Sequence, residues 1–190
     1  MSLSYQIEPL SLCWNEMIQL AAAHWQETEG YRHGQPFCPS FERYNQYDQA
    51  GWFIMFIARD GAKMAGYAGM YLTPSMHTQQ LIATEDTWFL LPQYRKGRNA
   101  IQFYQFVEDE CRRRGVVEIG MTAKLTNSAG RILEYLGYEV VSKQYSKHLS
   151  YNPKASPQPE TASSEVCADS AIANPVMESA NVRTLSTAPT

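Results

Sequence analysis

A basic turn between a hydrophobic strand and an apolar helix is the first part of this sequence that could do chemistry. Arg95, Lys96 and Arg98 surround Gly97 directly after the stretch "FLLPQY", and an apolar run at helical spacing follows. Backbone N–H groups at a helix N-terminus form an anion site, which the positive end of the helix dipole strengthens. The turn therefore indicates a phosphate site; the alternative is a solvated basic turn without a ligand.

The elements around this turn form an α/β mixture rather than a regular alternation of strands and helices. Strands are expected over 5–10, 80–91, 117–123 and 138–149, and a hairpin over 52–72 with Asp60-Gly61 as its turn. Helices are expected over 12–25, 99–114 and 128–136, with a further short helix between 26 and 51. Ser11 is the expected N-cap of the first helix.

Length, charge and cysteine spacing bound the class of protein. The chain has 190 residues and a net charge of −3, which argues against global attraction to nucleic acid or to an anionic membrane. No apolar run approaches 18 residues, and the acidic N-terminal stretch does not resemble a signal peptide. The four cysteines lie far apart, which predicts neither a disulfide framework nor a zinc site. A cytoplasmic protein fits this pattern best.

The composition changes near Tyr151. Residues 151–190 contain 7 Ala, 6 Ser, 5 Pro and 4 Thr, and Tyr151 is their only aromatic residue. Such a segment cannot bury enough apolar surface to offset the entropy of ordering it. We therefore expect a folded domain over 1–150 and a disordered, low-complexity tail over 151–190.

In the order of their elements and in the basic turn, residues 5–150 resemble the GNAT family of acyl-CoA-dependent N-acyltransferases. The family signature is Arg or Gln, two residues, Gly, one residue, then Gly or Ala. Arg95 and Ala100 match its ends, whereas Arg98 stands where Gly is usual and Gly97 lies one place early. The stretch "LTNSAGRILEYLGYEVV" is similar to the family segment in which an Asn precedes a short helix. The pattern "ED…LPQYRKGR" is similar to bacteriophage-encoded members.

The resemblance implies a central, mostly antiparallel mixed sheet flanked by helices, and acetyl-CoA as co-substrate with an amine as acceptor. The basic turn would then hold the coenzyme A pyrophosphate, with Gly97 allowing close approach of the chain. Backbone N–H groups near the end of the preceding strand would face the thioester carbonyl if the strand bulges there. The residues implied for acetyl-CoA binding are Phe89, Leu90, Leu91, Arg95, Lys96, Gly97, Arg98, Asn99, Ala100 and Asn127.

Acyl transfer to an amine needs a base, and the adjacent acids Glu85 and Asp86 precede the turn. Strand alternation places them on opposite faces, so at most one points into the cleft. Asp86 would share its face with Trp88 and Leu90, which favours Glu85 as the base. A carboxyl beside apolar groups would have a raised pKa, which suits this role. The alternative is that both are ordinary strand-edge charges.

The proton donor is less well marked. The family often places a Tyr four residues before the Gly that ends the last helix, and this position is Leu133 here. Tyr135 and Tyr145 are the alternative donors, although Tyr135 is equally explained as a packed or surface aromatic residue. Asn127 matches the Asn that commonly contacts the pantetheine arm in the family, and capping of the next helix explains it as well.

The remaining polar and aromatic residues give weaker indications. The histidines show no metal-ligand spacing, so no metal is expected, and His24 is expected to be packed or exposed at the end of the first helix. In the resembling fold, the aromatic residues between Tyr31 and Phe53 cover the acceptor site; packing under a long loop also explains them.

Two function classes follow from these features. The first is an N-acetyltransferase acting on a primary amine of a small molecule, a peptide terminus or a lysine. The alternative is an inactive protein of the same fold, phage-encoded, which binds a protein partner or a virion assembly through its tail.

Overall fold

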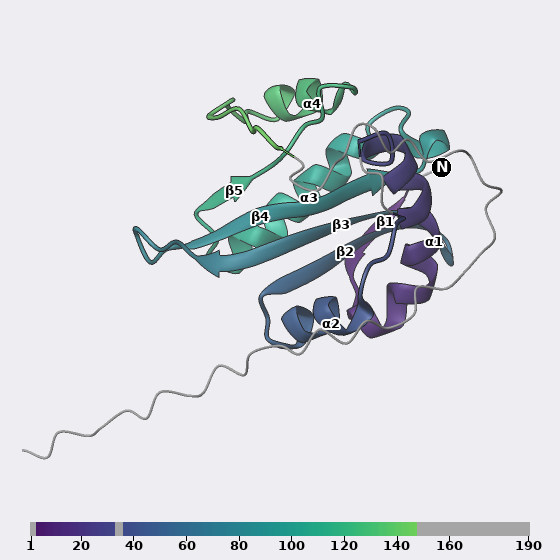
Figure 1. Ribbon diagram of the computed structural model, residues 1–190, viewed down its shortest axis with the longest axis horizontal. Coiled ribbons are helices and arrows are strands. Elements are labelled where there is room, and N and C mark those ends of the chain that lie inside the picture. Colours follow the sequence, from purple (N-terminus) through teal and green to yellow (C-terminus); the bar gives the residue numbers. More distant parts are fainter. Residues whose placement is uncertain (1–2, 33–35, 148–190) are drawn as a thin grey trace, which may run out of the picture. The chain divides into compact units, whose positions relative to one another are not determined.

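A five-stranded sheet forms the centre of the protein, as shown by a computed structural model that describes residues 3–32 and 36–147 (Figure 1). The strand order is β1-β2-β3-β4-β5, antiparallel except for the parallel pair β4–β5. The strands are β1 Ser4–Ile7, β2 Phe53–Asp60, β3 Lys63–Pro74, β4 Leu81–Leu90 and β5 Glu118–Gly120. The predicted mixed, mostly antiparallel sheet is confirmed.

Helices cover both faces of this sheet. They are α1 Leu10–Thr28, α2 Phe41–Gln49, α3 Asn99–Arg113 and α4 Ala129–Tyr135, with a 3₁₀ turn, η1, at Pro92–Tyr94. Figure 1 shows α3 along one face and α1 on the other. Each predicted helix is present, and the short helix expected between 26 and 51 is α2, which Ser40 caps by accepting from the Arg43 N–H.

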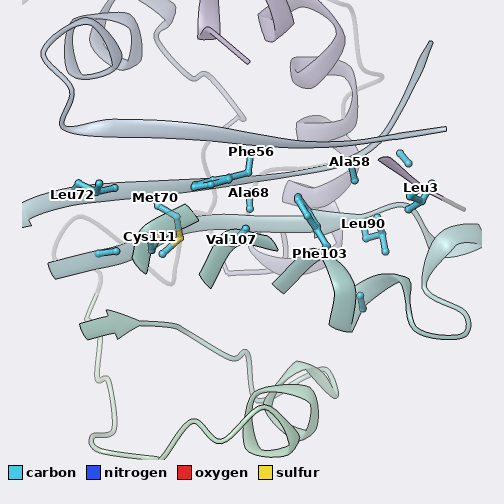
Figure 2. Packing of buried hydrophobic residues seen from close by; sticks show 13 residues of the cluster. Leu3, Phe56, Ala58, Ala68, Met70, Leu72, Leu90, Phe103, Val107 and Cys111 are labelled. Atoms are coloured by element: carbon cyan, nitrogen blue, oxygen red, sulfur yellow. The ribbon is translucent and has the colours of Figure 1, made fainter. Parts of the chain in front are cut away.

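The face under α3 is closed by apolar packing. Phe103, Val107 and Cys111 of α3 lie against Ala68 and Met70 of β3, as Figure 2 shows. Cys111 and Phe103 are fully buried. Burying a large apolar side chain contributes about 1.5–3 kcal/mol, so this face is a structural core that leaves no space for a ligand.

The first helix begins earlier than the sequence predicts, and Ser11 lies inside it. The prediction of Ser11 as N-cap is wrong because a residue distant in sequence supplies the cap. The Oδ2 atom of Asp48, at the end of α2, accepts a hydrogen bond from the Leu10 N–H at 3.2 Å. This bond satisfies a helix N–H that has no partner within the helix, and it ties α1 to α2.

The strand predicted over 138–149 does not form in its described part, residues 138–147. Gly137, at a φ of 90°, ends α4, and the Tyr138 N–H donates to the Leu133 carbonyl at 3.0 Å. The chain is thereby fixed by a helix C-terminal motif where the strand should start. Val140 and Val141 stay exposed, because an alternating apolar pattern makes a strand only beside a partner strand.

The predicted tail over 151–190 lies outside the described residues. The boundary between a folded domain over 1–150 and this tail therefore stays a prediction from composition. The same holds for the partner or virion assembly that the tail was expected to bind.

Candidate active site

The sheet face opposite α3 opens into a cavity of about 480 Å³. Its walls come from α1, α2, β3, β4, the chain before α2 and residues 122–124. Aromatic side chains make up much of the lining: Trp14, Trp25, Phe37, Tyr44, Tyr67 and Tyr71. The aromatic residues between Tyr31 and Phe53 thus contribute Phe37 and Tyr44 to this cavity, and their part in an acceptor site stays a prediction.

A β-bulge in β4 brings the two adjacent acids to this cavity. Thr87 pairs with Gly69 and Glu85 pairs with Met70, so Asp86 has no partner on β3. The extra residue breaks the alternation of side chains. As a result Glu85, Asp86 and Thr87 all line the cavity. The prediction that at most one acid reaches the cleft is wrong, because alternation holds only in a regular strand.

Asp86 lies between two tyrosines. The Tyr44 hydroxyl donates to Oδ2 of Asp86 at 2.9 Å, and Tyr71 lines the cavity with it. Partial desolvation by the cavity walls raises the pKa of Asp86, and the Tyr44 and Tyr71 hydroxyls oppose that rise. The acid does not share its environment with Trp88, which stacks on Tyr104 of α3 on the other face.

Glu85 lies at the fork where β4 and β5 separate. The two strands pair only from Ile82–Glu118 to Thr84–Gly120, and beyond them the Thr122 N–H donates to Oε2 of Glu85 at 3.0 Å. Burial raises the pKa of Glu85, the neighbouring Asp86 charge adds to the rise, and the Thr122 N–H opposes it. A carboxyl with a raised pKa in a cavity has the properties of a general base.

His24 is a cavity residue that the sequence did not identify as functional. Its Nδ1 lies 2.9 Å from the Tyr67 hydroxyl and 3.2 Å from Oγ1 of Thr87, and its ring stacks on Phe89. Burial lowers the pKa of His24 to about 4, so the ring is neutral at physiological pH. Because α1 continues to Thr28, His24 lies within the helix and faces the sheet. A single histidine in an amphipathic helix gives no local signal for this contact.

The basic turn follows β4 and the 3₁₀ turn η1, and it leads directly into α3. Gly97 has a φ of 67°, and a Cβ added there would meet nothing within 4 Å. The positive φ favours glycine at this position, and the close approach of a ligand to Gly97 stays a prediction from the sequence. Arg98 precedes the first residue of α3 and provides no side-chain cap. The first N–H groups of α3, from Asn99 onward, have no acceptor within the helix.

The side chain of Arg95 is held by hydrogen bonds to other residues of the protein. Its guanidinium forms two hydrogen bonds of 2.7 Å with the Glu27 carboxylate, and Nε donates to the Leu90 carbonyl at 2.7 Å. It also lies 5.2 Å from the centre of the Phe89 ring. Lys96 and Arg98, by contrast, form no ion pair with any residue in 3–32 or 36–147. Free positive charge at this turn therefore comes from Lys96 and Arg98, whereas Arg95 ties the turn to α1.

The end of β4 is regular. Phe89 pairs with Tyr67 and Leu90 with Gly66, and the Leu91 N–H donates to the Ala65 carbonyl at 2.9 Å. The bulge expected near 89–91 is found at Asp86 instead. The Leu91 N–H is thus occupied. The Leu90 carbonyl points away from β3 to Arg95, and in an antiparallel strand the N–H of the same residue points the same way.

Five further predicted site residues lie outside the cavity. Tyr135 and Tyr145 are 68% and 89% exposed, and neither lines the cavity that holds Glu85. Oδ1 of Asn127 accepts from the Ala129 N–H at 3.0 Å, so its side chain organises the start of α4. Ala100 is buried against the core under α3, and Asn99 donates from Nδ2 to the Tyr94 carbonyl.

The fold is that of known acetyltransferases. The chain is similar to ribosomal-protein-alanine N-acetyltransferase from Brucella melitensis biovar Abortus 2308, with 17% identity, a TM-score of 0.64, and coverage of 80% of this chain and all of that one. It is also similar to glucosamine-6-phosphate N-acetyltransferase from Arabidopsis thaliana, with 12% identity, a TM-score of 0.60, and coverage of 79% and 100%. This is the GNAT fold.

A predicted acetyltransferase from Clostridium acetobutylicum, solved with acetyl-CoA, has 11% identity to this chain, a TM-score of 0.56, and coverage of 78% of this chain and 97% of that one. No protein-family model and no curated protein matches the sequence. At these identities the similarity establishes the fold of this chain. The link to bacteriophage proteins stays a prediction from the sequence.

Residues 3–32 and 36–147 contain no group of three potential metal ligands, and none of their helices is long and apolar enough to cross a membrane. Cys13 and Cys111 are free and buried.

Proposed function

We propose that this chain is an N-acetyltransferase that moves an acetyl group from acetyl-CoA to a primary amine. The observation that carries the proposal is the course of β4, which runs from the two acids at the cavity to the open turn before α3. One continuous segment thereby places a candidate base and a candidate phosphate site at its two ends. The GNAT fold supports this assignment, and it stays a proposal for this chain.

The turn before α3 fits the coenzyme A pyrophosphate. The unpaired N–H groups of the first turn of α3 would donate to it, and Lys96 and Arg98 would supply positive charge. The space around Gly97 is open, which leaves room for the phosphates. Arg95 acts indirectly in this proposal, since its bonds to Glu27 and Leu90 hold the turn in place.

The edge of β4 that faces away from β3 is free beyond the short pairing with β5. Backbone groups along this edge, including those of Leu90, would hold the pantetheine arm between the turn and the cavity. Acetyl-CoA supplies the thioester that the amine attacks. The new C–N bond forms as the C–S bond breaks, and the sulfur leaves as a thiolate that requires a proton.

Glu85 is the proposed base. Its raised pKa brings its proton affinity closer to that of the reacting amine than an exposed glutamate would have. The Thr122 N–H fixes one carboxylate oxygen and leaves the other for the proton. Tyr135 and Tyr145 are exposed and do not line the cavity, so the proposal takes its proton donor from the cavity tyrosines. Burial raises the pKa values of the cavity residues Tyr44, Tyr67 and Tyr71, so all three stay protonated. Because Tyr44 already donates to Asp86, Tyr67 and Tyr71 are the candidate donors to the thiolate.

The test combines a binding and a transfer measurement. Calorimetric titration with acetyl-CoA should give saturable binding, and release of the free CoA thiol should depend on added amine. A protein that shows no affinity for CoA at millimolar concentration would contradict the proposal. Binding without transfer to any amine would instead favour the inactive protein of the same fold.

A further inference from the structure

The charge balance of the cavity restricts the amine that it can accept. Glu29 and Lys124 line the cavity as an ion pair, and Glu29 also pairs with Arg32. His24 is neutral at physiological pH. Glu85 and Asp86 form no ion pair with any described residue, although both carboxylates face the cavity. The Lys124 charge lowers the pKa of Glu85, whereas no positive group among the described residues acts on Asp86 in this way. Asp86 is therefore the acidic group of the cavity that lacks a positive partner within the described residues.

Asp86 has the features of a cation-binding group. A hydrogen bond from Tyr44 orients its carboxylate, Tyr71 lines the cavity with it, and the bulge leaves the carboxylate solvent-accessible within the cavity. A fixed and accessible carboxylate is ready to form a charge-assisted hydrogen bond without reorganisation. Neither tyrosine neutralises its charge.

The aromatic walls provide a second, independent indication of a cationic ligand. Trp14, Tyr44 and Tyr71 come from three different elements and all line the same cavity as Asp86. Aromatic ring faces attract ammonium groups, and the attraction grows when the cation is shielded from water. Such walls also favour an apolar spacer between charged groups. An anionic or a strongly hydrated neutral ligand would gain nothing from either feature.

We infer that the acceptor is an amine with two cationic nitrogens, joined by an apolar spacer, and that Asp86 determines this specificity. One nitrogen is presented to Glu85 for acetylation, while the second remains an ammonium and binds Asp86 between Tyr44 and Tyr71. The inference rests on the proposed acetyl transfer. It deepens that proposal by giving Glu85 and Asp86 separate roles.

Matched amines test this division. Linear α,ω-diamines of three to six carbons are compared with the monoamines of equal length, using CoA thiol release by the full-length protein. The best diamine should exceed its monoamine in kcat/KM by about 10- to 100-fold, which is the size of one charge-assisted hydrogen bond. In Asp86→Asn this ratio should fall toward one. Tyr44→Phe and Tyr71→Phe should each lower the ratio partly, since the carboxylate is then less well fixed.

Glu118→Gln is the matched control because it removes one negative charge from β5 outside the cavity. Its diamine-to-monoamine ratio should equal that of the wild type. Equal use of diamines and monoamines by the wild type, or an unchanged ratio in Asp86→Asn, would overturn the inference. Either result would leave the proposed transferase activity standing.

A binding measurement separates the two proposals further. Diamines and monoamines are titrated calorimetrically into the protein saturated with CoA, a condition that needs no turnover. Tighter binding of diamines that depends on Asp86 supports the inference even when no acetyl transfer occurs. Absence of any diamine preference in binding overturns it even when transfer to monoamines is observed.

Discussion

The acidic cavity at Glu85–Thr87 and the basic turn at 95–100 lie at the two ends of one chain segment, yet they are built differently. The turn is formed by contiguous residues, with Gly97 setting its backbone and α3 beginning directly after it. The cavity needs side chains from α1, α2, β3 and the chain after β5. The difference shows that local chemistry can mark the proposed phosphate site, whereas the proposed acceptor site depends on which distant elements meet there.

Removing the proposed base should give the largest effect on the cavity and none on the turn. Glu85→Gln is expected to lower kcat by about 10² to 10⁴, because the amide cannot accept the amine proton. The affinity for acetyl-CoA, measured by calorimetry, should stay within about 2-fold of the wild type because the turn is intact. An active Glu85→Gln enzyme, with loss in Asp86→Asn instead, would transfer the role of base to Asp86.

The pH dependence of the rate should report the same carboxyl group. Glu85 accepts a proton only when ionised, and burial raises its pKa above the ordinary 4.5. The rate kcat/KM should therefore rise with pH, about tenfold per unit on the acid side of that raised pKa, and then level off. The His24 titration, near pH 4, falls below this range. The increase of kcat/KM with pH should be absent from the residual activity of Glu85→Gln. If the increase persists in that variant, it reports deprotonation of the amine substrate instead of Glu85.

Substitutions in the turn should affect coenzyme binding and leave the cavity unchanged. Lys96→Gln and Arg98→Gln are each expected to weaken acetyl-CoA binding about 10-fold, more at low ionic strength, because each removes one unpaired positive charge. Arg112→Gln, at the far end of α3, is the control and should bind as the wild type. Binding that is independent of both turn residues and of salt would contradict a pyrophosphate site here.

The glycine in the turn gives a smaller, conformational effect. Gly97→Ala should destabilise the protein by about 1 kcal/mol, because a φ of 67° disfavours any side chain even where space is open. Gly130→Ala is the matched control: Gly130 lies in α4, and its added Cβ would make only an ordinary contact with Ala123. We expect that variant to be as stable as the wild type or more stable. Chemical denaturation measures both.

The smallest effect is expected for the ion pair between Arg95 of the turn and Glu27 of α1. A double-mutant cycle of Arg95→Ala and Glu27→Ala should give a coupling of about 0.5–1 kcal/mol, since both partners are partly exposed and solvent screens the pair. A coupling near zero would show that the ion pair does not hold the turn. The effect of Arg95 on coenzyme binding should then arise from direct contact instead.

Much of the fold could be predicted because its signals are local. The hairpin turn near Gly61, the capped α2 and the length of α3 all follow from turn residues, caps and apolar spacing. The strand expected over 138–149 failed in its described part for the opposite reason. A strand is stabilised by a neighbour, and no sequence pattern within the segment shows whether that neighbour is present.

The candidate site also depends on contacts between distant segments, which a local sequence pattern does not predict. The sequence alone determined that two acids precede a basic turn at a strand-to-helix junction, because residue type and spacing are enough to mark each feature. Only the tertiary structure decided that both acids face the cavity, since the bulge at Asp86 arises from pairing with Gly69 and Met70. It likewise joined His24 to Tyr67 and Arg95 to Glu27. These contacts join residues more than 40 positions apart. Neither the periodicity nor the local spacing of the sequence predicts a hydrogen bond between residues so far apart.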